Sequence, residues 1–169
     1  ILDTAQAVGM KVQLHIIDMV EPISQSGGTA EQWTALRNFV LAWKDHPALL
    51  AWYIADDGSG AYLPSVYTFI KQLDPYHLIT MAIAGVGDAW RPKYFSGVDV
   101  IMPETYPRAP PGAYETMEIM ARFPFDFAPR ISCLMAWSPA GPGNNEAALT
   151  SPMFTAELYS SLAAGGTGL

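Results

Sequence analysis

The fold is decided by the stretch Asp45-His46-Pro47-Ala48-Leu49-Leu50-Ala51-Trp52-Tyr53-Ile54-Ala55-Asp56-Asp57-Gly58, in which an apolar run ends abruptly in two adjacent carboxylates. The run from 48 to 55 has the length and composition of a buried β-strand. Side chains alternate along a strand, so Asp57 shares a face with Tyr53, and Asp56 lies on the opposite face. One carboxylate is therefore expected at the mouth of the sheet, and the other toward a helix layer or capping the loop.

Helical and strand patterns alternate on both sides of this run. Thr29 opens a helix, because Gln32 follows at the spacing of a capping box. That helix carries an apolar stripe at helical period, in which Trp33 and Trp43 are expected to lie in the core. Strands are predicted at 10–18, 48–55, 77–84, 98–102 and 131–137, and helices at 1–8, from 29 to Pro47, through 66–73, at 113–123 and from 151 onward.

This alternation indicates parallel β/α units, which fit either a (β/α)8 barrel or a doubly wound open sheet. An open sheet of the nucleotide-binding kind needs a glycine-rich phosphate loop after its first strand. Here the first strand runs into Met19-Val20-Glu21-Pro22 instead. Polar residues recur at the carboxyl ends of the strands, where barrels gather their chemistry. The sequence therefore favours a barrel.

The length of the chain limits how much of a barrel it can form, and its composition limits the classes of ligand it is expected to bind. The chain has 169 residues, whereas a complete barrel needs at least about 200. Residues 1–169 are therefore interpreted as one incomplete barrel domain of a longer chain, whose remainder is its expected partner. The net charge of −7 disfavours nucleic acid and anionic membrane surfaces, and no apolar run approaches a membrane span. The single Cys133 excludes an internal disulfide and is expected to be buried.

Several of these segments together resemble a known family. His46-Pro47, Trp52-Tyr53 and Asp56-Asp57-Gly58 resemble the strand-four signature of clan A glycoside hydrolases, (β/α)8 barrels in which Trp-Tyr precedes Asp-Glu-Pro. Similar turns and strand ends of that family follow in order at 73–77, 99–107 and 162–169. The resemblance implies that 169 begins strand eight, so that the chain covers about strands three to seven. It also implies a glycan or oligosaccharide substrate, no cofactor, and an extracellular or secreted location.

The resemblance puts Asp57 in the position of the general acid/base, and two departures from the family accompany it. Asp57 replaces a Glu, which shortens the side chain by one methylene. The strand-seven end, where the family has a nucleophilic Glu, reads Ala136-Trp137-Ser138-Pro139 and holds no carboxylate. The remaining candidate is Glu104, which is expected either to be the partner of Asp57 or to accept hydrogen bonds from sugar hydroxyls. A separation of about 6.5–9.5 Å would suit an inverting reaction and about 5–5.5 Å a retaining one.

Other polar and aromatic residues near the strand ends are candidates for binding substrate. They are His15, Asp18, Tyr53, Asp56, Tyr106 and Trp137. Each has a structural alternative, because strand-end carboxylates also cap loops and aromatic rings are ordinary core material. No metal site is predicted, since His46 and His77 stand at strand beginnings. Three functions stay open: a glycoside hydrolase, a carbohydrate-binding or scaffold barrel with a degenerate active site, and a hydrolase of another substrate.

Overall fold

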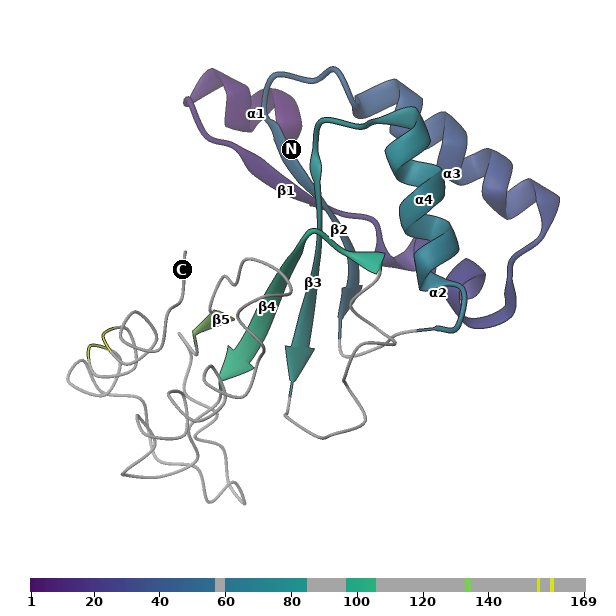
Figure 1. Ribbon diagram of the computed structural model, residues 1–169. Helices are drawn as coiled ribbons and strands as arrows, with labels where there is room; N and C mark the ends of the chain where they lie inside the picture. Colours follow the sequence, from purple (N-terminus) through teal and green to yellow (C-terminus); the bar gives the residue numbers. More distant parts are fainter. Residues whose placement is uncertain (57–59, 85–96, 106–132, 135–154, 156–158, 160–169) are drawn as a thin grey trace, which may run out of the picture. The chain divides into compact units, whose positions relative to one another are not determined.

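The computed structural model describes residues 1–56, 60–84, 97–105, 133–134, 155 and 159. Within these ranges, no helix is long and apolar enough to cross a membrane. Helices and strands alternate along them (Figure 1): α1 (Leu2–Ala7), β1 (Val12–His15), α2 (Ile17–Ser26), α3 (Ala30–Trp43), β2 (Leu49–Asp56), α4 (Leu63–Leu73), β3 (Leu78–Ala84), β4 (Val100–Thr105) and β5 (Cys133–Leu134). Outside the described residues lie the helix predicted at 113–123, most of the strand predicted at 131–137 and most of the helix predicted from 151 onward.

The strands form one sheet in the order β1-β2-β3-β4-β5, which is also their order in the chain. β1 pairs with β2 in parallel, and β4 pairs with β5 in parallel. The prediction of an α/β protein with parallel strands is therefore confirmed. The chain divides into two compact units, one of Ile1–Met81 with Trp90–Val100 and the other of Ala82–Ala89 with Ile101–Leu169.

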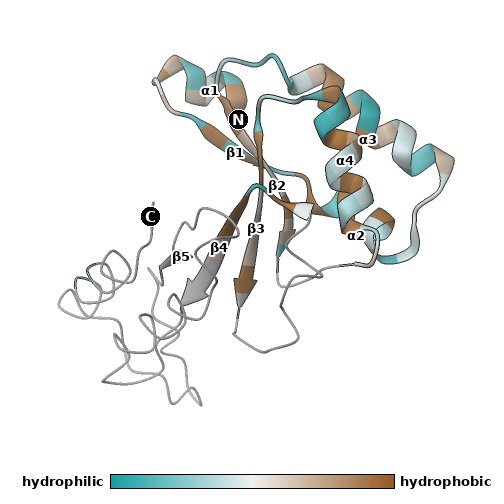
Figure 2. Ribbon diagram, viewed as in Figure 1, coloured by the Kyte–Doolittle hydropathy of each residue, from teal (hydrophilic) through white to brown (hydrophobic). Residues whose placement is uncertain are grey.

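The core of the first unit is built around β2. Most of its residues are buried on both faces, as expected of an inner strand in a parallel sheet. Trp52 is fully buried, and its ring lies 6.4 Å from that of Phe39 on α3. Val66 and Ile70 of α4 are also fully buried. Figure 2 shows the hydrophobic residues concentrated on the strands, while α3 and α4 also carry hydrophilic residues.

The start of α3 follows the predicted capping box. The Thr29 hydroxyl accepts a hydrogen bond from the Gln32 backbone N–H at 3.3 Å, and the Gln32 side chain accepts one from the Thr29 N–H at 2.8 Å. Leu36 and Val40 of the predicted stripe are fully buried. Trp43, at the last turn, is 36% exposed, so its assignment to the core was wrong.

Substitution of Thr29 by Ala removes half of this capping box. We expect Thr29→Ala to lower the free energy of unfolding by about 1 kcal/mol, because it leaves a helix N–H without its acceptor. Urea denaturation measures the change. Thr34→Ala on the same helix is the control, since Thr34 is exposed and only donates back to Ala30. An equal loss in both variants would contradict a specific role for the cap.

The first strand and the segment after it differ from the sequence prediction. β1 ends at His15, and α2 follows at once, where the prediction continued the strand to 18 and then a loop. Pro22 sits inside α2, where it removes one backbone hydrogen bond. Burial of Val20 and Ile23, both fully buried, offsets that loss. Gly27 ends the helix at φ +88°.

Candidate functional site

The carboxyl ends of β1 and β2 bring two of the predicted substrate-binding residues together. His15 pairs in register with Tyr53, and their ring centroids are 5.7 Å apart. Val12 and Leu14 pack against a cluster that contains Leu2, which puts His15 on the opposite face of β1. His15 is exposed and Tyr53 is half-buried. An imidazole and a phenol can both donate and accept hydrogen bonds to sugar hydroxyls.

Asp56, the last residue of β2, lies on the side of α2. It is exposed and lines a cavity of about 70 Å³ with Ile17, Glu21, Ser24, Gln25, Ile54 and Ala55. This position agrees with the predicted alternation, in which one of the paired carboxylates faces the helix layer. Asp18 is exposed in the first turn of α2, where the positive end of the helix dipole stabilises a carboxylate.

The segment that follows Asp57 is held against α2 by a close backbone contact. A Cβ added at Gly60 would lie 1.8 Å from the Ser24 carbonyl oxygen, so only glycine fits there. The same carbonyl accepts a hydrogen bond from the Tyr62 N–H at 3.0 Å. The backbone is therefore fixed by β2 before Asp57 and by α2 after it. Asp57 itself lies outside the described residues, as do Tyr106 and Trp137.

Glu104 belongs to the second unit. It lies in β4, where its backbone is in register with Cys133 of β5. Within the described ranges, no three His, Cys, Asp or Glu side chains gather as metal ligands would.

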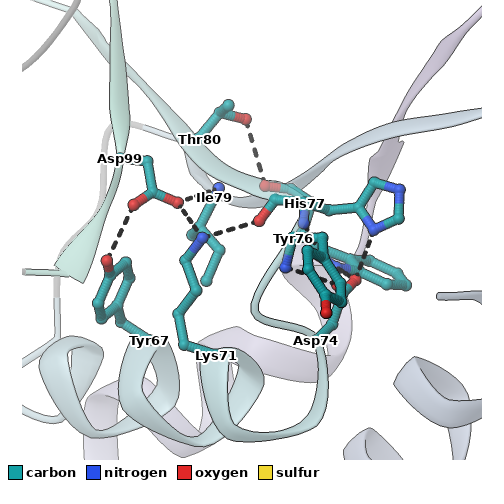
Figure 3. Close-up of polar contacts among 9 residues, drawn as sticks. Tyr67, Lys71, Asp74, Tyr76, His77, Ile79, Thr80 and Asp99 are labelled. Atoms are coloured by element: carbon teal, nitrogen blue, oxygen red, sulfur yellow. Dashed lines mark hydrogen bonds and ion pairs between the residues drawn. The ribbon is translucent and has the colours of Figure 1, made fainter.

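A polar cluster that the sequence analysis missed lies near the amino end of β3 (Figure 3), and the buried Asp74 is its centre. One carboxylate oxygen accepts a hydrogen bond from Trp52 Nε1 at 2.8 Å and lies 2.8 Å from His77 Nδ1. The other accepts from the backbone N–H groups of Tyr76 and His77. Burial alone would raise the pKa of Asp74, but these hydrogen bonds outweigh it and hold the pKa below its ordinary value.

Asp99 is a second carboxylate near the amino end of β3. It accepts hydrogen bonds from the Tyr67 hydroxyl at 2.9 Å and from the Ile79 N–H at 2.8 Å, and it forms an ion pair with Lys71 at 2.7 Å. Burial, with the nearby Asp99 charge, raises the pKa of Tyr67. Through these contacts, the two carboxylates join α4 and the turn after it to β2 and β3. The cluster around Asp74 and Asp99 is therefore interpreted as structural.

The lowered pKa of Asp74 predicts a loss of stability in acid. Because its folded pKa lies below the unfolded value of about 3.9, the ionised carboxylate stabilises the fold above that pH. That stabilisation is lost as the pH falls below about 4. Urea denaturation at a series of pH values should show a shallower acid dependence in Asp74→Asn than in the wild type. Parallel curves for the two proteins would contradict this assignment.

Comparison with known proteins adds evidence on the fold. No protein-family model and no curated protein matches the chain. A solved structure assigned as an alpha-L-fucosidase from Bacteroides thetaiotaomicron aligns with 99% of this chain, with a TM-score of 0.70 and 11% identity. The β-glucuronidase of Ruminococcus gnavus aligns with 80% of it, with a TM-score of 0.51 and 15% identity. The chain spans 61% of the first protein and 28% of the second. It therefore shares an α/β fold with these distant glycoside hydrolases.

Proposed function

We propose that this chain is part of a (β/α)8 barrel of the clan A glycoside hydrolase type and cleaves a glycan by carboxylate acid/base chemistry. The observation that carries the proposal is that β2 ends at Asp56, which Asp57 follows in the sequence, within an α/β fold shared with two glycosidases. Chemistry in such barrels gathers at the carboxyl ends of the strands. His15 and Tyr53, in contact at that end, support a polar binding surface there.

The proposed mechanism uses two carboxyl groups with different roles. Asp57, as the acid, gives its proton to the glycosidic oxygen as the bond to the anomeric carbon breaks. Glu104 is the partner, which either activates a water or attacks the anomeric carbon. Around them, His15, Asp18, Tyr53, Asp56, Tyr106 and Trp137 are proposed to bind sugar hydroxyls and ring faces.

A second candidate is a barrel that binds carbohydrate without cleaving it. Two sequence features favour it: Asp57 stands where the resembling family has Glu, and the segment Ala136-Trp137-Ser138-Pro139 offers no carboxylate. A displacement of about 1 Å at a reacting group can cost roughly a hundredfold in rate. Such a barrel would retain sugar affinity and lack turnover.

The experiment that separates the two candidates is sugar release from a panel of α- and β-linked glycans, with the wild type beside Asp57→Asn. Turnover by the wild type that the variant loses supports the hydrolase. If the wild type and Asp57→Asn are equally well folded and bind a glycan without cleaving it, the binding barrel is supported. Turnover that survives the substitution contradicts the role of Asp57 and leaves the hydrolase standing.

A further inference from the structure

We infer that the groove between α3 and α4 is a second carbohydrate-binding site, which takes a neutral stretch of a glycan without cleaving it. The choice of a glycan rests on the proposed function, while the groove itself is separate from the strand-end residues. The two helices pack side by side (Figure 1), and the groove between them has a volume of about 450 Å³. The groove is shallow and open to solvent, so a ligand would lie along it rather than be enclosed.

The groove combines aromatic and neutral polar side chains. It is lined by Trp33 of α3 and by Pro64, Ser65, Thr68, Phe69 and Gln72 of α4. None of these side chains is ionisable. The protein carries a net charge of −7, which disfavours anionic ligands. The lining contains no carboxylate that could pair with a cationic ligand. The lining therefore selects an uncharged ligand that has both apolar faces and hydrogen-bonding groups.

The aromatic part of the groove is held in place before any ligand binds. The Trp33 Nε1 donates a hydrogen bond to the Gly27 carbonyl oxygen at 2.8 Å. Its ring also meets that of Phe69 edge to face, with centroids 4.8 Å apart and an interplanar angle of 68°. Because Phe69 and Trp33 fix each other, little side-chain entropy remains to be lost on binding.

The polar side chains of the groove have donors and acceptors that can form hydrogen bonds with a ligand. Ser65 and Gln72 are exposed, and their side chains make no hydrogen bond to any other residue in the described ranges. Thr68 donates its hydroxyl proton to the Pro64 carbonyl at 2.9 Å, so its oxygen still has lone pairs to accept a proton. A Gln amide both donates and accepts, and a Ser hydroxyl does the same.

A sugar unit matches this combination of groups. Its C–H faces carry a slight positive charge, which is attracted to the negative face of an aromatic ring. Its hydroxyl groups lie around the rim of the ring, where Ser65, Thr68 and Gln72 can bond them. The helical spacing of Ser65, Thr68 and Gln72 puts them on one side of α4.

The test is the affinity of the protein for neutral oligosaccharides, measured by calorimetry with cellohexaose, maltohexaose, xylohexaose and mannohexaose. Asp57→Asn is the background, so that the sugars stay intact. For a sugar that binds, we expect the added pair Ser65→Ala with Gln72→Ala to weaken binding about tenfold. Trp33→Ala should weaken it at least as much. Asn38→Ala, exposed on α3 outside the groove, is the matched control and should leave the affinity unchanged.

The outcomes separate this inference from the proposed function. Affinity that falls in the groove variants and not in Asn38→Ala supports the groove. Equal affinity in all folded variants contradicts the inference that the groove binds carbohydrate, even where the wild type cleaves the sugar. Groove-dependent binding by a wild type that cleaves none of the panel supports the groove and contradicts the hydrolase. Binding of none of the four sugars overturns the groove. So does a dimer that Trp33→Ala abolishes, because a second copy of the chain would then occupy it.

Discussion

The Asp57→Asn protein is expected to release sugar at least about a hundredfold more slowly than the wild type, as follows from the loss of a general acid. Asn has nearly the shape of Asp but no acidic proton to give to the leaving oxygen. The loss should fall on kcat, because the proton is transferred in the transition state rather than on binding. Initial rates over a range of substrate concentrations measure both constants.

Two further variants make the test of Asp57 specific. Asp56→Asn changes the neighbouring carboxylate, which lines the cavity beside α2, and we expect it to raise KM while kcat stays within about threefold. Asp57→Glu restores the length of the family's acid and should match or exceed the wild-type rate. An equal fall of kcat in Asp56→Asn and Asp57→Asn would contradict the distinct roles of the two carboxylates.

Asp74→Ala is expected to lower the free energy of unfolding by about 1–3 kcal/mol, which is the cost of one buried donor left without a partner. The Trp52 indole N–H is fully buried and would lose its acceptor, whereas the part-buried backbone N–H groups of Tyr76 and His77 would turn to water. The loss should come without a change in kcat for the protein that remains folded, because these contacts lie near the amino end of β3.

Urea denaturation of Asp74→Ala at neutral pH measures this effect. Asp45→Ala is the matched control, because Asp45 is an exposed carboxylate after α3, and its removal should change stability by no more than about 0.5 kcal/mol. A loss below about 1 kcal/mol in Asp74→Ala would show that water replaces the missing carboxylate, and the cluster would then not be a structural support.

The sequence predicted those parts of the fold that depend on local pattern. The capping box at Thr29 and Gln32 and the apolar run of β2 are short-range signals, and both were confirmed. α2 was missed because the strand was predicted to continue to 18, while the burial of Val20 and Ile23 that stabilises the helix depends on distant parts of the chain. Local propensity therefore lost to tertiary packing at this one element.

The candidate site was less predictable, because its geometry depends on strand register. A slip of one residue between β1 and β2 would move His15 away from Tyr53 and onto the other face. The pairing is irregular between Val12 and Gln13, and the sequence pattern did not indicate this irregularity. The partnership of Trp52 and Asp74 likewise joins residues on different elements. In the sequence, Asp74 falls in the turn at 73–77, and nothing local indicates that its carboxylate binds Trp52.

The close approach of Gly60 to Ser24 has a consequence for engineering. No side chain at position 60 is compatible with the present path of α2. The segment after β2 and the helix after β1 therefore constrain each other and can be exchanged only together. A loop graft at 57–62 from a related protein would succeed only if 17–28 were transplanted with it, and randomised libraries should either hold Gly60 constant or vary both segments together.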